Sequence, residues 1–539
     1  MINITDLVMK FLKSIPPHPL LWALFPPLAL LGNNISQVSP GDAVRTLLAS
    51  LLLALILWGM LRLVLRDWRR AALVVTAFLV LFFSYGHIYH LLEDRLVLGV
   101  NLGRHRFLLI LFALLMLAVI IWVVRARDVL RVTTALNLIG VLAIIFPLYQ
   151  VISYQVRTAI PPGAAPQASL LAEIAGLKVP QGNSPPDIYY IILDSYTRAD
   201  TLSNHFSYDN SSFLEALKKD GFYIAACSQS NYSYTTLSLV SSLNFNYLND
   251  INAGLQAGGK DETAAYPYLF NNAVTYTLRQ MGYRFVSFES GFSPTELRNA
   301  DIYYSQESDW LGILLEDGIN PFEAMQLNTS AGMFLYELSP HLPARIQKFL
   351  SLDTAYVVHR NRILYTLNRL ERIASVPGPK FVFVHILAPH NPFVFGPNGE
   401  YIERTTPFTL NDDRDVVLFQ DYANGYRDQV TYLNQRMLAI VDDLIKGSSQ
   451  LPIIILQGDH GVPRLPGWND TILNAYYLPG GGEAALYPGI SPVNTFRVIF
   501  DQYFAGQLSL LPDASCTTNA AKDPFGCQPV IDPNPSCTP

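Results

Sequence analysis

Charged residues and cysteines are both scarce in this chain of 539 residues. Charged side chains make up 15% of the sequence against 50% hydrophobic residues, a balance that is unusual for a soluble protein. The formal net charge is −6, so the chain lacks the basic excess that nucleic-acid-binding proteins carry. It also lacks internal repeats and low-complexity segments. The composition therefore argues against a nucleic-acid partner and against an ordinary soluble domain.

The four cysteines all lie after the most apolar part of the chain. Cys227 stands alone, whereas Cys516, Cys527 and Cys537 crowd the C-terminal tail. No two of them have the C-x-x-C spacing of zinc sites, which disfavours a zinc site in the tail. In an oxidising compartment this pattern predicts at least one disulfide in the tail, with a connectivity that the sequence leaves open.

The apolar excess lies almost entirely before about residue 155, in runs that approach the ~20 residues needed to span a bilayer. We predict five membrane helices there, although Pro26 and Pro27 interrupt the first. These helices cover residues 18–34, 44–65, 71–91, 107–124 and 132–153. The first run has no small-residue cleavage pattern and further spans follow it, which argues against a cleavable signal peptide.

Basic residues predict how these helices cross the membrane. Arginines gather in the connections after the second and fourth helices, and the positive-inside rule places such connections in the cytoplasm. They are Arg62, Arg66, Arg69 and Arg70 in the first connection and Arg125, Arg127 and Arg131 in the second. With five crossings, the N-terminus is cytoplasmic and everything after residue 155 lies outside a multi-pass plasma-membrane protein. Arg95, Arg104 and Arg106 oppose this topology, because they fall in a connection assigned to the outside.

Four domains follow from these patterns: a membrane domain over 1–155, a Pro-rich linker over 156–186, a catalytic domain over 187–511 and an irregular tail over 512–539. In the domain over 187–511, strand-like runs alternate with helical runs, which predicts an α/β domain with a mostly parallel sheet and helices on both faces. The predicted strands are 188–193, 283–288, 380–385 and 453–456, and the predicted helices are 211–219, 274–281, 363–373 and 422–445. The aromatic-rich residues 300–360 are expected to cap the sheet.

Metal-ligand side chains follow two of the predicted strands. Asp194 ends the strand 188–193, and Asp459-His460-Gly461 follows the strand 453–456. Because sites in open α/β sheets form at the carboxyl ends of strands, we expect these residues to meet. Thr235 stands at the start of a helical segment, where free N–H groups favour a bound anion and a metal-bound hydroxyl can act as a nucleophile. Oxygen and imidazole ligands suit Mn²⁺ or Zn²⁺, and less naturally Ca²⁺ or Mg²⁺.

Four motifs in this order resemble the sulfatase / alkaline phosphatase superfamily over about residues 185–505. They are the run Asp187–Asp200 with Asp194 as metal ligand, the segment Thr235–Leu243 with Thr235 at the nucleophile position, His385-Ile-Leu-Ala-Pro-His390-Asn-Pro, and Gln457-Gly-Asp-His-Gly461. Thr236 is the nucleophile if the register slips by one residue. The resemblance implies an alkaline-phosphatase-like fold in which His390 contacts the substrate or protonates its leaving group. His385 and Arg198 are further candidate substrate contacts.

The nucleophile segment departs from the sulfatase pattern C-x-P-x-R, because Leu237 and Leu239 occupy the Pro and Arg positions. A threonine nucleophile in an external domain behind membrane helices is similar to lipoteichoic acid synthases and phosphoethanolamine transferases. That similarity implies transfer of a phospho-alcohol headgroup from a lipid to an envelope acceptor through phospho-threonine. Two alternatives stay open: a hydrolase of phosphate or sulfate esters, and a catalytically silent membrane scaffold.

Each candidate residue also has a purely structural explanation. Asp194 and Thr235 could be helix N-caps, and Asp459 and His460 could form a polar turn. His385 could orient another ligand, and Arg198 could pair with Asp200 instead of a substrate anion. The sequence does not decide the donor, the acceptor or the oligomeric state.

Overall fold

The computed structural model describes residues 16–537, with gaps at 36–37, 94–95, 98–99, 102–103, 159–167, 182–183, 252–261, 307–318, 339–340, 342, 344–353, 403–418, 463–464, 466–469, 520–522, 530–531 and 533. The chain forms two compact units. The first comprises Met1–Gln155, Glu307–Val358 and Arg404–Thr409, and the second comprises Val156–Gln306, His359–Glu403 and Leu410–Pro539.

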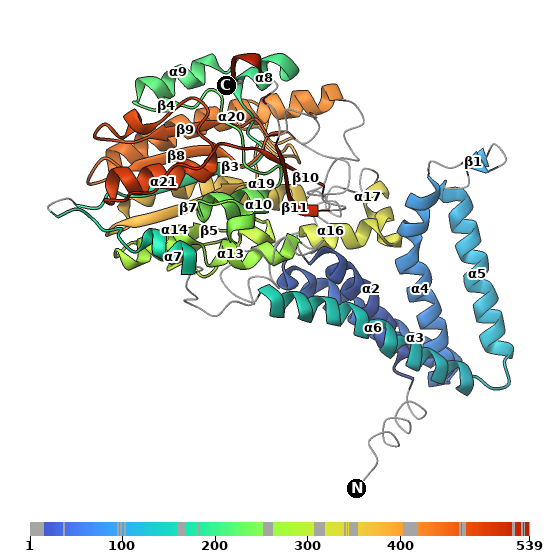
Figure 1. Ribbon diagram of the computed structural model, residues 1–539. Helices are drawn as coiled ribbons and strands as arrows, with labels where there is room; N and C mark the ends of the chain where they lie inside the picture. Colours follow the sequence, from blue (N-terminus) through green and yellow to red (C-terminus); the bar gives the residue numbers. More distant parts are fainter. Residues whose placement is uncertain are drawn as a thin grey trace, which may run out of the picture. The chain divides into compact units, whose positions relative to one another are not determined.

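Five long helices form at the predicted positions in the first unit (Figure 1). They are α2 (His18–Asn34), α3 (Val44–Leu65), α4 (Trp68–Leu92), α5 (His105–Arg125) and α6 (Leu130–Thr158), with short strands β1 (Leu96–Val97) and β2 (Val100–Asn101) between α4 and α5. Four stretches among the described residues, each containing one of α3 to α6, are long and apolar enough to cross a membrane. The 17-residue α2, with Pro26 and Pro27 inside it, is not among them, so the predicted number of five spans is not reproduced.

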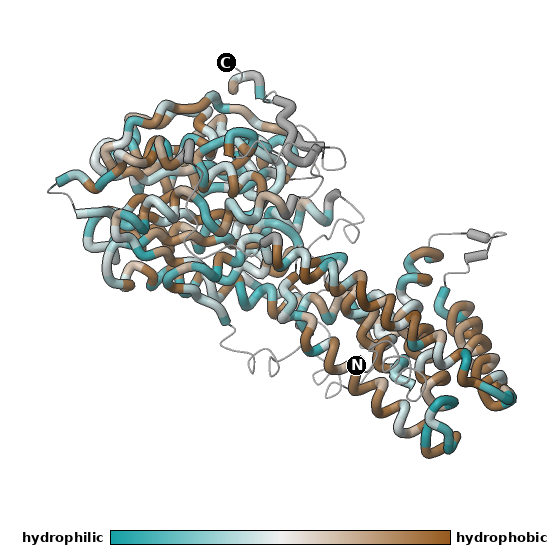
Figure 2. The backbone as a smooth tube through the Cα atoms, turned by 60° about the horizontal axis from the view of Figure 1, so that its bottom comes forward, coloured by the Kyte–Doolittle hydropathy of each residue, from teal (hydrophilic) through white to brown (hydrophobic). Residues whose placement is uncertain are grey.

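The four candidate spans are predominantly hydrophobic, with scattered hydrophilic positions (Figure 2). Helices α3, α5 and α6 leave large apolar side chains such as Leu63, Ile110 and Phe146 exposed, as expected of surfaces that face lipid. Helix α4 is the most buried of the four. It shares apolar clusters with α2 and α3 through Val75 and with α5 and α6 through Val74.

Residues from the segment 300–360 pack against these N-terminal helices. This segment contains α16 (Pro321–Asn328) and α17 (Phe334–Leu338), which belong to the first compact unit. Arg45 at the start of α3 pairs with Glu323 at 2.6 Å, and the backbone of Asn328–Ser330 lies so close to Gly86 of α4 that a Cβ would come within 2.4 Å of it. The expectation that residues 300–360 cap the sheet is therefore wrong for α16, which contacts the N-terminal helix α3 through Glu323 and Arg45.

The second unit is an α/β domain around one seven-stranded sheet of order β4-β9-β8-β3-β7-β5-β6. Its strands are β3 (Ile188–Leu193), β4 (Tyr223–Ile224), β5 (Arg284–Phe288), β6 (Ile302–Tyr304), β7 (Lys380–Ile386), β8 (Ile453–Gly458) and β9 (Asn474–Tyr477). β3 pairs in parallel with both β7 and β8, and only β9 runs against its neighbours in this sheet. The predicted, mostly parallel sheet is thus confirmed, with β9 as an antiparallel strand that the prediction missed.

Helices cover both faces of the sheet (Figure 1). The helices of this unit are α7 (Ala168–Ile174), α8 (Ala199–Phe206), α9 (Ser211–Lys219), α10 (Thr235–Leu243), α11 (Leu248–Ile251), α13 (Tyr266–Phe270), α14 (Ala273–Gln280), α19 (Thr354–Leu370), α20 (Phe419–Gly447) and α21 (Pro492–Tyr503). On one face, Tyr190 and Ile192 of β3 join a core with α10, α14 and α21. On the other face, the Tyr189 hydroxyl lies 3.3 Å from that of Ser448, which follows α20.

The described part of the C-terminal tail contains regular structure, where we expected irregular structure from its Pro and Asn content. It forms an antiparallel hairpin of β10 (Cys516–Asn519) and β11 (Asp523–Pro529). The Cys516 amide donates to the Asn231 carbonyl at 2.9 Å, and a disulfide joins Cys227 to Cys537. Cys516 is disulfide-bonded as well. The tail is therefore attached to the segment that precedes α10.

Candidate metal centre and nucleophile

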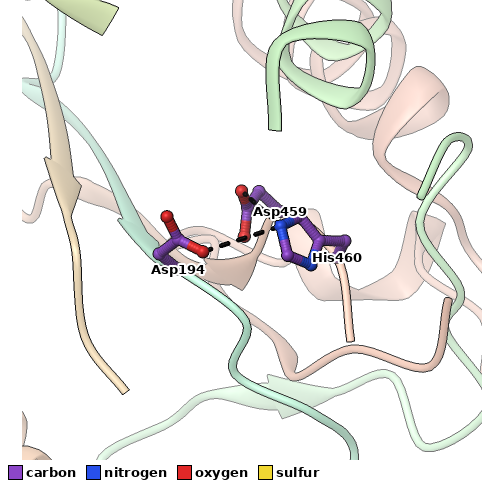
Figure 3. Close-up of side chains that lie close together, drawn as sticks. All are labelled: Asp194, Asp459 and His460. Carbon is purple, nitrogen blue, oxygen red and sulfur yellow. Dashed lines mark ion pairs between the residues drawn. The ribbon is translucent and has the colours of Figure 1, made fainter. Parts of the chain in front are cut away.

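The ends of three adjacent strands bring the predicted ligands together. Leu193, the last residue of β3, pairs with Gly458 at the end of β8 and with Ile386 at the end of β7. Asp194 and Asp459 follow directly, so both carboxylates lie at the same edge of the sheet. Asp194, Asp459 and His460 are buried, and each offers a ligand atom within 4.8 Å of the others (Figure 3).

Gly458 permits the close approach of the two strand ends. A Cβ at this position would lie 2.3 Å from the carbonyl oxygen of Tyr196, in the turn that follows Asp194. Ser195 in that turn has a φ of 61°, an uncommon value for a residue with a side chain. Its amide donates to Asp459 Oδ1 at 3.0 Å, which ties the two ligand-bearing turns together and leaves Oδ2 for another partner.

His460 is oriented by the hydrogen bond of its other ring nitrogen. Nδ1 lies 2.7 Å from the carbonyl of Gly461, which can only accept, so Nδ1 carries the proton and Nε2 faces the carboxylates. Nε2 lies 3.6 Å from oxygens of both Asp194 and Asp459. Burial by itself lowers the pKa of His460, but the nearby carboxylates of Asp459 and Asp194 raise it above its ordinary value.

His385 of β7 joins the same cluster from the third strand. Thr295 Oγ1 donates to the Phe292 carbonyl at 3.1 Å and lies 2.9 Å from His385 Nδ1, so it is placed to accept the Nδ1 proton. The opposite nitrogen, Nε2, lies 3.3 Å from Asp194 Oδ2 and 4.0 Å from Asp459 Oδ2. Burial opposes ionisation of Asp194, but His390, His385 and His460 together lower its pKa well below the ordinary range.

Ligand atoms at this centre are left without hydrogen bonds. Asp194 Oδ1, Asp459 Oδ2 and His385 Nε2 are all buried, and none has a hydrogen-bond partner among the described residues. Buried carboxylate oxygens and an imidazole lone pair that converge without partners are costly unless a cation lies between them. The donor set therefore fits a divalent metal ion, and oxygen with imidazole suits Zn²⁺ or Mn²⁺.

Thr235 is the first residue of α10 and is buried beside this centre. Its Oγ1 lies 3.3 Å from His460 Nε2. Thr236 is also buried. Of the two threonines, Thr235 is thus the one whose hydroxyl lies within hydrogen-bonding distance of His460.

His390 and Arg198 lie in different surroundings. The His390 amide donates to the Asp194 carbonyl at 3.0 Å, and its ring centre is 6.4 Å from that of His460, so it borders the centre. Arg198 is buried, and its guanidinium pairs with Asp200 at 2.7 Å and with Asp532 of the tail at 2.8 Å. These contacts favour the interpretation of Arg198 as an ion-pair partner of Asp200 over its interpretation as a substrate contact.

No model of a protein family matches the sequence, and no curated protein matches it. Solved structures do. The chain is similar to the C-terminal periplasmic domain of EcEptC from Escherichia coli in complex with Zn, with 15% identity over 70% of this chain and 98% of that one and a TM-score of 0.41. It is also similar to the integral membrane lipooligosaccharide phosphoethanolamine transferase A from Neisseria meningitidis, with 13% identity, coverage of 91% and 95%, and a TM-score of 0.39.

The lipoteichoic acid synthase LtaP from Listeria monocytogenes matches as well, with 13% identity over 60% of this chain and 74% of that one and a TM-score of 0.33. At these identities, each likeness is one of fold alone.

Sequence reasoning missed two residues of the centre, Ser195 and Thr295. Both are ordinary hydroxyl residues whose roles depend on Asp459 and His385, which lie far from them in the chain. The serine directly after a strand-terminal aspartate was the only available hint for Ser195.

Proposed function

We propose that this protein is a metal-dependent transferase that moves a phospho-alcohol headgroup from a lipid donor to an envelope acceptor through phospho-Thr235. One observation carries the proposal. The Thr235 hydroxyl, at the N-terminus of α10, lies 3.3 Å from His460 Nε2, beside buried candidate ligand atoms that have no hydrogen-bond partner in the described part of the chain. A nucleophilic oxygen, a cation site and a helix N-terminus for an anion therefore coincide.

Asp194, Asp459 and His460 would hold the divalent ion, with Thr235 Oγ1 as a further oxygen ligand and His385 beside them. When bound, the ion supplies Lewis acidity, which makes the threonine hydroxyl more acidic and offsets the charge of a phosphoryl group. Ser195 and Thr295 hold Asp459 and His385 in place. Without such fixed partners the ligands would have to reorganise on binding.

In the first step, Thr235 Oγ attacks the phosphorus of a phosphodiester. The Oγ–P bond forms, the bond from phosphorus to the lipid alcohol breaks, and the hydroxyl proton ends on the departing alcohol. His390 is the group that we propose delivers it. Its Nδ1 donates to the Asn391 carbonyl, so Nε2 is the nitrogen that exchanges protons. In the second step, an acceptor hydroxyl gives its proton to His390 and attacks phosphorus. The bond from the acceptor oxygen to phosphorus forms, the Oγ–P bond breaks, and the proton on His390 passes to Thr235 Oγ, which restores the free hydroxyl.

We also propose an external location for the second unit. The basic connections between α3 and α4 and between α5 and α6 favour the cytoplasm. The residues that follow α6 are then outside whether or not α2 crosses, since only the side of the N-terminus depends on α2. The Cys227–Cys537 disulfide agrees with an oxidising compartment.

High-resolution mass spectrometry of the Thr235 peptide tests the proposal, with the full-length protein expressed in its native membrane. His390→Ala should accumulate an adduct if it slows the second step, and Thr235→Val should carry none. A phospho-alcohol adduct, whose mass identifies the transferred group, supports the transferase. A bare phospho or sulfo adduct would instead support an ester hydrolase, and no adduct together with no bound metal would support a silent scaffold.

A further inference from the structure

The short segment Asp470–Leu473, which leads into β9, connects the three segments that carry the site. The Leu473 amide donates to the Tyr196 carbonyl at 3.0 Å, in the turn after Asp194. The Leu473 carbonyl accepts from Gly458 at 2.8 Å, directly before Asp459. One residue of the segment thus contacts both metal-ligand turns.

The same segment holds the loop that precedes the nucleophile. The Ser230 amide donates to the Asp470 carbonyl at 2.7 Å, and the Ile472 amide donates to the Ser228 carbonyl at 3.3 Å. Thr471 lies between them, and its hydroxyl is 2.7 Å from that of Thr201. We call residues 228–234 the nucleophile loop.

Asp470 adds a side-chain contact at the end of this loop. Its Oδ1 accepts a 2.6 Å hydrogen bond from the hydroxyl of Ser233, two residues before Thr235. The carboxyl group is fully buried, and its Oδ2 has no hydrogen-bond partner among the described residues. Burial of this carboxyl group with an unpaired oxygen costs stability, and the hydrogen bond to Ser233 is a side-chain contact that offsets part of that cost.

From these contacts we propose that Asp470 is a positioning residue for the nucleophile, acting through Ser233 and Ser230. This inference rests on the proposed function of Thr235. All nine residues of α10 are buried, so the helix itself is fixed by the core. The entry of the chain into α10 then determines where the Thr235 hydroxyl points. Asp470 binds the residues that lead into α10, and it belongs to the same segment that hydrogen-bonds the turns after Asp194 and before Asp459. The positions of the nucleophile and of the metal ligands relative to one another are thereby fixed.

The test compares Asp470→Ala, Asp470→Asn and Ser233→Ala in the full-length protein, with Asp442→Asn on the exposed side of α20 as the matched control. The assay follows single-turnover modification of Thr235 and steady-state hydrolysis of a bis(nitrophenyl) phosphodiester, and bound metal is measured in each variant. A misplacement near 1 Å costs on the order of 100-fold in rate. We expect Asp470→Ala and Ser233→Ala to lower kcat by about 10- to 100-fold, with KM and bound metal within about twofold of the wild type.

Two comparisons separate positioning from stability. The double variant should be no slower than the worse single variant, because both substitutions remove one interaction. Asp470→Asn should recover most of kcat, since its amide oxygen can still accept from Ser233. If Asp470→Ala does not fold, Ser233→Ala alone decides, because it removes a single hydroxyl.

A kcat within twofold of the wild type for Ser233→Ala, or loss of metal in parallel with kcat, would overturn the inference. Its failure is distinguishable from failure of the proposed function. If Thr235→Val keeps full activity, the proposed function is wrong; if Thr235→Val is inactive while Ser233→Ala is unaffected, only the positioning role is wrong.

Discussion

Asp459→Asn should have opposite effects on stability with and without a metal ion. Asparagine keeps the side-chain oxygen that accepts the Ser195 amide, and it has nearly the same volume as aspartate. It removes one negative charge and weakens the oxygen ligand. The substitution therefore separates the cost of clustered charge from the benefit of ligation.

The structure indicates the size of each effect. Two unit charges at the 4.8 Å limit of the Asp194–Asp459–His460 cluster repel by about 3 kcal/mol at an effective dielectric constant of about 20. The histidines at this centre offset part of that, so the metal-free variant should be as stable as the wild type or more stable by about 1 kcal/mol. In contrast, a ligand at a hundred times its Kd stabilises the protein by about 2.7 kcal/mol. The variant should lose most of this second effect.

Thermal unfolding of the detergent-solubilised protein measures both effects: the repulsion between carboxylates after chelation, and the stabilisation by the metal ion after Zn²⁺ or Mn²⁺ is added. The wild type should gain several degrees with metal, and Asp459→Asn should gain little. Asp442→Asn, which changes an exposed residue paired with Lys446, serves as the control and should behave as the wild type. The reasoning is refuted if Asp459→Asn melts well below the wild type after chelation and still gains the full metal shift.

Three further predictions concern the same centre. Thr295→Val removes the oxygen that accepts from His385 Nδ1, so we expect metal affinity measured in a metal buffer to fall about 10- to 100-fold, and an unchanged Kd would contradict this role. Gly458→Ala forces a Cβ against the Tyr196 carbonyl, and thermal unfolding should show a loss of about 1–3 kcal/mol together with lower activity. The raised pKa of His460 in the folded state means that its stabilising effect is present below an unfolded pKa of about 6.5 and is lost as the pH rises through the folded pKa. Chelated protein should therefore melt at a lower temperature at pH 9 than at pH 6, and His460→Gln should reduce that difference.

The parts of the fold that the sequence predicted well are those with a local signal. β3 coincides with the predicted strand 188–193, because a short, fully buried apolar run ends at an aspartate. The helix 211–219 likewise matches α9, whose apolar residues recur with helical spacing. The meeting of Asp194, Asp459 and His460 could be predicted, because Asp194 and Asp459 directly follow such strands and His460 is the next residue.

The parts that the sequence did not predict depend on distant partners. Asn-Ala-Tyr-Tyr of β9 has neither a run of branched residues nor a clear alternation, and it becomes a strand by pairing with β8. The position of α16 depends on Arg45, hundreds of residues earlier in the chain. The β10–β11 hairpin of the tail was not predicted, because its proline content normally disfavours strands.

The Cys227–Cys537 disulfide has a consequence for the biogenesis of the protein. It joins residues separated by 310 positions in the sequence. The covalent link to the segment before α10 can therefore close only after both cysteines have been synthesised. A chain that ends before Cys537 would carry Asp194, Thr235 and Asp459 but not this closure. With the external location proposed for the second unit, we expect the disulfide to form only after that unit has reached the oxidising side of the membrane.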